Sequence, residues 1–295
     1  MRILSPKMDV IFKLLFGDAR NADILGDFLQ AVLDLDAAEF AELTIVDPHL
    51  KQEFPQDKLG ILDVKLKTKS GHTIDIEIQV LSMPEMRQRL VYYLSNMITE
   101  QLREGDSYLE LKRSICIAIV DFPLITESGS CHTVFRLLEQ QEHFPFTNLL
   151  EINVLDLTKV PTEEPGKLMD WLRFIKAEQE EEFQMASNEN AAIQKAYAKL
   201  QVLSDDEANK MLYDARVKAW RDEQSRLGGA RRDGLAEGRA EGRMEGRMEG
   251  RTEGRTEGRA EIIRLMFADG TDAPTIAKTL HMEEARVAEL LAPPM

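Results

Sequence analysis

Two carboxylates in neighbouring segments of this sequence could bind a divalent cation between them. Asp63 lies in GILDVKLKTK, residues 60–69, and Glu77 lies in HTIDIEIQV, residues 72–80. The Cβ atoms of directly opposite residues in adjacent strands are about 5 Å apart, so an opposed Asp63 and Glu77 could share one cation. Without a cation the two carboxylates repel each other, and one pKa rises. Oxygen ligands of this kind suit Mg²⁺, with Mn²⁺ and Ca²⁺ as the other candidates, and they leave positions open for water and phosphate.

The strand register decides whether these carboxylates meet. Apolar and polar residues alternate in both segments, which predicts two β-strands with one apolar and one polar face each. A pairing centred on Ser70 sets Asp63 opposite Glu77 and Lys65 opposite Asp75 while keeping the apolar residues on one face. A register shifted by one residue would place an apolar side chain opposite Glu77, so we predict the first register. The alternative for the polar face is a solvated outer surface without chemistry.

The elements around these strands predict an α/β domain over residues 1–160. Helical apolar spacing marks two early helices and a longer one after the strand pair, and β-branched runs mark three further strands. The expected helices cover 9–17, 22–35 and 84–105, and the expected further strands lie within 43–50, 113–123 and 149–157. Their order favours a mixed central sheet flanked by helices.

The rest of the chain is predicted to be a helical extension at 161–233, a repeat at 234–260 and a small tail at 261–295. Glu-Gly-Arg recurs every four residues from Glu237 to Arg259. Each glycine disfavours a helix by about 1 kcal/mol relative to alanine, and every i,i+4 pair joins like charges. The repeat is therefore either a loose linker or a helix that pairs with a second copy, and we favour pairing into a dimer or larger homo-oligomer.

The tail is expected to contain three short helices with breaks at Asp269-Gly270 and near His281, a spacing similar to a helix-turn-helix. It either contacts DNA, joins two chains or only caps the chain. Acids and bases are balanced there and a basic recognition helix is lacking, which favours a cap.

Composition limits the function classes. The 295 residues include 43% hydrophobic and 30% charged residues, typical of a globular protein, and the net charge of −15 argues against indiscriminate binding of polyanions. Any attraction for DNA must therefore be local. Cys116 and Cys131 have no metal-ligand spacing, so we expect two buried thiols in a reducing compartment. No signal peptide and no membrane span is expected, and the predicted location is the cytoplasm.

Several stretches together resemble one nuclease family. They are SPKMDVIFKLLFG at 5–17, LDVKLKTKSGHTIDIEIQV at 62–80, RQRLVYYLSNMI at 87–98, and the Glu-Gly-rich repeat with its helical tail. This layout is similar to the PD-(D/E)-x-K nuclease superfamily, and more narrowly to its recombination-promoting nuclease or putative transposase family. The resemblance implies a restriction-endonuclease-like core and metal-dependent cleavage of DNA.

The resemblance also assigns residues. Asp63 matches the first acid of the motif and Glu77 the second, both as metal ligands, with the backbone carbonyl of Ile78 as a further candidate ligand. Gln79 stands where the superfamily pattern has lysine, and would orient the attacking water through hydrogen bonds only. Asp9 falls where many members have an additional acid.

Basic residues near the motif complete the predicted site. Lys65 could supply the positive charge that Gln79 lacks, although it could equally be a cross-strand partner of Asp75 alone. Lys67, Arg87 and Arg89 are the candidates for contact with the DNA backbone.

Three functions follow from these expectations. The first is a Mg²⁺-dependent DNA endonuclease, linked to recombination or to defence against mobile DNA. The second is a transposase-like protein that uses cleavage for strand exchange. The third is an inactive nuclease fold that acts as an oligomeric regulatory or binding protein, a function that the acidic balance of the chain favours.

Overall fold

The computed structural model describes residues 2–46, 63–188 and 190–292. The chain divides into two units, Met1–Asp222 and Glu223–Met295. The division falls inside the long helix α7 (Glu207–Ala268), so each unit is described by itself. The predicted strand within 43–50 is described only as far as Val46, and its remainder lies outside the described residues, as does Leu62.

The first unit contains a mixed six-stranded sheet in the order β1-β2-β3-β4-β6-β5. Neighbouring strands are antiparallel except for β3, β4 and β6, which run parallel to one another. The strands are β1 (Thr44–Val46), β2 (Val64–Lys67), β3 (Thr73–Gln79), β4 (Ser114–Val120), β5 (His132–Arg136) and β6 (Leu150–Asp156). All predicted strands are present, and β5 is an addition. Its residues are half-buried or exposed, so it lacks the buried alternation that marks the others.

The register predicted for the strand pair is confirmed. Lys65 pairs with Asp75 and Val64 pairs with Ile76, so the next position along the same register brings Asp63 beside Glu77. The turn between the strands is centred on Ser70, and Gly71 has a positive φ of 85°, which glycine adopts without strain. Apolar residues of both strands therefore share one face.

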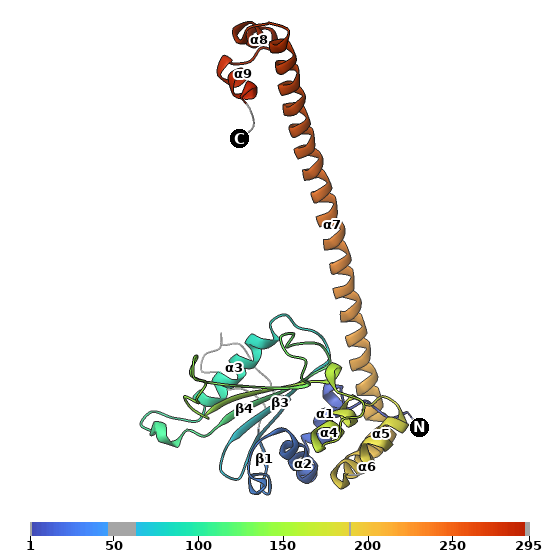
Figure 1. Ribbon diagram of the computed structural model, residues 1–295. Helices are drawn as coiled ribbons and strands as arrows, with labels where there is room; N and C mark the ends of the chain where they lie inside the picture. The colour runs from blue at the N-terminus through green and yellow to red at the C-terminus, as the bar shows by residue number, and fades with distance from the viewer. Residues whose placement is uncertain (1, 47–62, 189, 293–295) are drawn as a thin grey trace. The chain divides into compact units, whose positions relative to one another are not determined.

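Helices cover both faces of the sheet (Figure 1). One face packs into the main core with α1 (Asp9–Phe16), α2 (Ala22–Val32), α4 (Lys167–Lys176), α5 (Glu180–Ser187) and α6 (Ala191–Asp205). The other face packs against α3 (Met86–Thr99) in a second apolar cluster. A mixed sheet flanked by helices, with a long C-terminal helix, fits an α/β nuclease-like fold.

The helical extension differs from expectation at one point. Within the predicted helical extension, the helix over 167–183 is interrupted at Ala177–Gln179, and α5 then starts with a capping box between Gln179 and Glu182. This cap provides partners for backbone N–H groups of a new first turn, so two helices replace one. Trp171 of α4 is fully buried in the main core, which shows that the extension packs with the sheet in the first unit.

The second unit contains the remainder of α7, followed by α8 (Ala273–Leu280) and α9 (Glu284–Leu291). The whole Glu-Gly-Arg repeat is helical, and no atom lies within 4 Å of a Cβ built on any of its glycines. The expected first tail helix is the end of α7, which corrects three short helices to two. The breaks at Asp269-Gly270 and His281 are confirmed, and Ile263, Ile276 and Val287 form a small core. No described helix is long and apolar enough to cross a membrane.

Candidate active site

The two predicted carboxylates are joined through the backbone of their own strands. The backbone N–H of Asp63 donates to Glu77 Oε1 at 3.1 Å. In return, Asp63 Oδ2 accepts a hydrogen bond from the backbone N–H of Ile78 at 2.9 Å. These two bonds orient both carboxyl groups before any ligand arrives, because each side chain is fixed by the strand that carries the other.

The polar face that carries these groups is buried. Asp75 and Glu77 are 0% and 2% exposed, and Lys65 is 7% exposed. Helix α3 covers this face, which also carries Cys116 and Ala118 of β4. The alternative of a solvated strand face is therefore wrong, because these side chains are covered by the protein. Burial of a carboxylate without a compensating partner is unfavourable.

Burial perturbs the titration of this face. Burial, followed by the neighbouring charge of Asp63, raises the pKa of Glu77 to about 8. Burial and the charge of Glu77 also raise the pKa of Asp75 well above its ordinary value. Carboxyl groups with strongly raised pKa values are common at functional sites.

Two cationic side chains approach the carboxylates from the flanking helices. Lys13 Nζ of α1 lies 2.9 Å from Asp63 Oδ1, and Arg89 Nη2 of α3 lies 3.0 Å from Glu77 Oε2. The hydroxyl of Tyr93 accepts a 2.7 Å bond from Arg89 Nε, which fixes the guanidinium. Arg89 was expected near the site, whereas Lys13 was not. Its position one helical turn after Asp9 was the available signal, because i and i+4 side chains share one helix face.

An open pocket of about 330 Å³ lies over Asp63. Its wall is formed by residues of the segment before α1, of α1, β3 and α3, and of the first turns of α7. The lining residues are Lys7, Met8, Asp9, Asp63, Ile78, Gln79, Val80, Leu81, Arg89, Arg216, Ala219 and Trp220. The structure thus brings five of the predicted site residues to one cavity, and Glu77 lies beside Asp63.

Gln79 and Asp9 occupy the edge of this pocket. Gln79 Nε2 donates to the backbone carbonyl of Leu81 at 3.2 Å, which leaves its side-chain oxygen available. Asp9 forms an ion pair with Arg216 of α7. Although burial opposes ionisation of Asp9, hydrogen bonds from Arg216 lower its pKa overall. Asp9 is therefore an ionised group on the wall.

Trp220 is a pocket residue that the sequence did not indicate. Its indole Nε1 is buried and has no hydrogen-bond partner within the described chain. Buried donors are almost always paired in folded proteins. The indole ring of Trp220 therefore lines the pocket, whereas its unpaired N–H is closed off from solvent.

Three other predicted basic residues do not line the pocket. Lys65 Nζ pairs with Glu100 Oε2 at 2.7 Å at the end of α3. Arg87 pairs with Glu127 at 2.8 Å, and Lys67 is exposed at the end of β2. Lys13 and Arg89 are therefore the cations at the carboxylates.

The donor set is compatible with a divalent metal. No group of three His, Cys, Asp or Glu residues that could bind a metal exists in the part of the chain that the structure describes. Mg²⁺, however, is usually bound by one or two carboxylates, with waters and substrate phosphates completing its shell. Asp63 and Glu77 supply such a pair.

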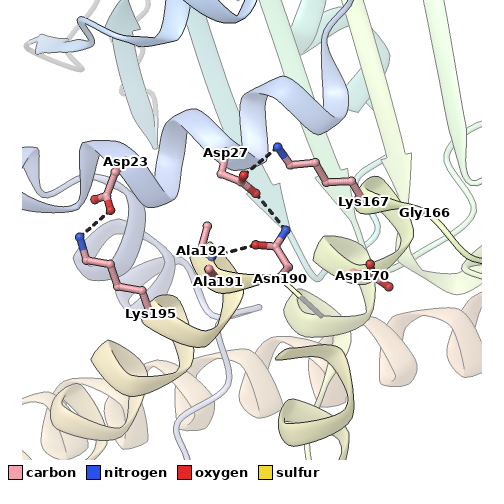
Figure 2. Close-up of a pocket in the computed structure, with 9 residues that line it drawn as sticks. All are labelled: Asp23, Asp27, Gly166, Lys167, Asp170, Asn190, Ala191, Ala192 and Lys195. Atoms are coloured by element: carbon pink, nitrogen blue, oxygen red, sulfur yellow. Dashed lines mark hydrogen bonds and ion pairs between the residues drawn. The ribbon is translucent and has the colours of Figure 1, made fainter. Parts of the chain in front are cut away.

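A larger cavity of about 840 Å³ lies between α2, α4 and α6, away from the carboxylates (Figure 2). Its charged side chains pair with one another: Lys167 bonds Asp27 at 2.7 Å and Lys195 bonds Asp23 at 2.6 Å. Asp27 also accepts a 2.8 Å bond from the indole N–H of Trp171. These bonds join three helices, so the cavity is a junction between helices that is separate from the pocket over Asp63.

Comparison with known proteins agrees with this geometry. No curated protein and no solved structure matches the chain significantly. The family described as PD-(D/E)XK nuclease family transposase matches residues 6–230, which include every element of the first unit and every residue of the pocket. Because this match covers most of the chain, the protein belongs to the PD-(D/E)XK nuclease family transposases.

Proposed function

We propose that this protein is a Mg²⁺-dependent DNA endonuclease built on a restriction-endonuclease-like core. The observation that supports the proposal best is the pairing of Asp63 with Glu77 beside an open pocket. Family membership supports nuclease chemistry in general. Metal dependence and endonucleolytic cleavage rest on the paired carboxylates and on the unfavourable ionisation of Glu77.

The two carboxylates and Gln79 each have a role in this proposal. Asp63 and Glu77 are the metal ligands, with the backbone carbonyl of Ile78 as a possible third. When bound, Mg²⁺ would polarise the scissile phosphate and lower the pKa of water. Gln79 orients the attacking water through its side-chain oxygen, since one N–H of its amide donates to the carbonyl of Leu81.

Lys13 takes the role of the missing lysine. It already lies 2.9 Å from Asp63, and its side chain is 41% exposed, so it can reach a phosphate that enters the pocket. A positive charge there stabilises the charge that develops on the phosphoryl oxygens. Arg89 and Trp220 line the pocket itself and supply further contacts to the DNA backbone.

Cleavage of supercoiled plasmid tests the proposal. Asp63→Asn keeps the shape of the side chain and removes its charge, and we expect at least a 100-fold loss of Mg²⁺-dependent cleavage. Asp18→Asn is the matched control, because Asp18 pairs with exposed Arg20 outside the pocket. Undiminished cleavage by Asp63→Asn, with folding intact, would refute the assignment.

Two other functions have specific support. The family description includes transposases, so cleavage could serve strand exchange, and an assay that detects joined ends distinguishes this from hydrolysis alone. The neutral Gln79 favours a catalytically weak protein that acts by binding. If millimolar Mg²⁺ or Ca²⁺ neither raises the melting temperature nor supports cleavage, the binding function is the correct one.

The repeat supports a homo-oligomer as part of the proposal. Residues 237–256 are exposed on all sides of a helix that contains a glycine at every fourth position. Such a helix is unfavourable alone, and a second copy would supply the missing contacts. Deletion of residues 236–295 should then lower the mass of the particle measured by light scattering. We further propose that the protein acts on DNA in the cytoplasm, in recombination or defence.

A further inference from the structure

Strand β5 forms one end of the sheet. It pairs with β6 along one edge, and among the described residues no strand pairs with its other edge. After Arg136 the chain continues into a hairpin, in which Phe146 N–H donates to Leu137 C=O at 3.0 Å and Glu139 N–H donates to Phe144 C=O at 2.8 Å. The edge and the hairpin are therefore ordered structure with unused backbone hydrogen-bonding groups.

This region exposes a group of large apolar side chains. Six of them fall within thirteen residues and are between 42% and 78% exposed; we call them the β5 surface, and they are Val134, Phe135, Leu137, Leu138, Phe144 and Phe146. Scattered apolar residues are ordinary on a protein surface, whereas six of them close together in one edge strand and its hairpin indicate an interaction site.

The edge lacks the usual protection against pairing. Natural edge strands are blocked by proline, by bulges or by charges that project outward. β5 has the sequence HTVFR without proline, and its one charged residue, Arg136, is turned to Glu151 of β6 at 2.7 Å. An unprotected edge in a folded protein is a template for another strand.

We propose that a second copy of this chain pairs with β5 in antiparallel orientation, so that the two sheets become one. Antiparallel pairing of a strand with its own copy is a two-fold arrangement in which the same surface meets itself, and apolar residues then face apolar residues. A nucleic acid is a poor occupant, because the stretch 132–148 contains Glu139 and Glu142 against Arg136 alone.

The exposed apolar area supports a contact between two copies. Aromatic side chains bury roughly 150–250 Å² each, so the exposed parts of the three phenylalanines amount to about 300 Å² per copy. The aliphatic side chains and the backbone of the edge add to this area, and a standard interface buries roughly 800 Å² per partner. The β5 surface therefore supplies a large part of the apolar area of one dimer contact.

The β5 surface and the catalytic pocket lie at opposite ends of the parallel strands. The hairpin leaves the sheet beside Glu151 near the start of β6, because Arg136 pairs with Glu151. The pocket lies at the end of β3, where Gln79 pairs with Val120 of β4. The dimer therefore leaves both pockets open, and this inference does not depend on the proposed nuclease activity.

Light scattering on the full chain tests the proposal. Phe146→Glu places a charge on the most exposed residue of the β5 surface, and we expect the particle mass to fall twofold relative to wild type. Met185→Glu is the matched control, because Met185 is 74% exposed on α5, and it should leave the mass unchanged. Val134→Lys provides a second variant should Phe146→Glu fail to fold, and its lysine lies on the edge strand itself.

Hydrogen exchange distinguishes this contact from pairing of the repeat. The β5 amides that do not face β6 should exchange at least 10-fold faster in Phe146→Glu than in wild type. Equal mass and equal exchange in wild type, Phe146→Glu and Met185→Glu would overturn the proposal, whether the common particle is a monomer or an oligomer.

Discussion

Replacement of Glu77 by glutamine should stabilise the metal-free protein at alkaline pH. The folded chain binds a proton on Glu77 up to a pKa of about 8, whereas the ordinary value is 4.5. Between these values the folded state binds more protons than the unfolded state, so the free energy of unfolding falls as the pH rises. The loss of stability caused by Glu77 is absent below about pH 4.5 and complete above about pH 8. Glutamine keeps the acceptor for Asp63 N–H and removes the ionisation.

The magnitude follows from the size of the shift. Each unit of pKa corresponds to about 1.4 kcal/mol, so the upper limit for this group is roughly 4–5 kcal/mol. The measured quantity is the difference in the free energy of unfolding between Glu77→Gln and wild type, obtained by urea denaturation with EDTA at pH values from 5 to 9. We expect this difference to increase in favour of the variant by at least 2 kcal/mol across that range.

A control and a ligand make the test specific. Glu39→Gln should show no such gain, because hydrogen bonds from Ser70 and Thr68 lower the pKa of this half-buried residue to about 2. Mg²⁺ should stabilise wild type at pH 8 and leave Glu77→Gln nearly unaffected, since the metal favours the ionised carboxylates. If the difference in the free energy of unfolding between wild type and Glu77→Gln does not change with pH, the reasoning is refuted.

Three further predictions concern the side chains around the carboxylates. Lys13→Ala should lower Mg²⁺-dependent cleavage by about 100-fold, because a positive charge near the developing phosphoryl charge is lost. Lys13→Arg should restore part of this activity. Equal cleavage rates for Lys13→Ala, Lys13→Arg and wild type in a plasmid assay would contradict this role. Lys65→Met should lower the free energy of unfolding by about 1–3 kcal/mol in urea, because it removes the charged hydrogen bond to Glu100 at 2.7 Å, while cleavage per folded molecule stays unchanged; a catalytic loss without a stability loss would instead support a catalytic Lys65. Trp220→Phe should weaken DNA binding several-fold in fluorescence anisotropy, because the ring that lines the pocket becomes smaller and its indole N–H is lost; unchanged affinity would argue against this contact.

The strand pairs show why part of the fold follows from the sequence. Alternation in β2 and β3 predicts both strands and their register, because a shift by one residue would bury every polar side chain against the apolar face. The strand β5 could not be predicted in the same way. It is a short edge strand whose residues are half-buried or exposed, so burial leaves no periodic signal in its sequence.

The cations of the site show where local sequence is insufficient. Lys65 and Lys13 are equally plausible partners for an acid when only spacing is known. Packing decides between them: α3 covers the polar face and provides Glu100 for Lys65, while α1 places Lys13 against Asp63. Sequence separation carries no information about which helix covers which face.

The sequence by itself determined the opposition of Asp63 and Glu77 in one strand pair, because side-chain direction in a strand is a local property of the backbone. Only the tertiary structure decided that this polar face is buried, that Lys13 and Arg89 form ion pairs with its carboxylates, and that Trp220 lines the pocket. These contacts join residues far apart in the chain, and they exist because the apolar faces of separate helices must be buried against the same sheet.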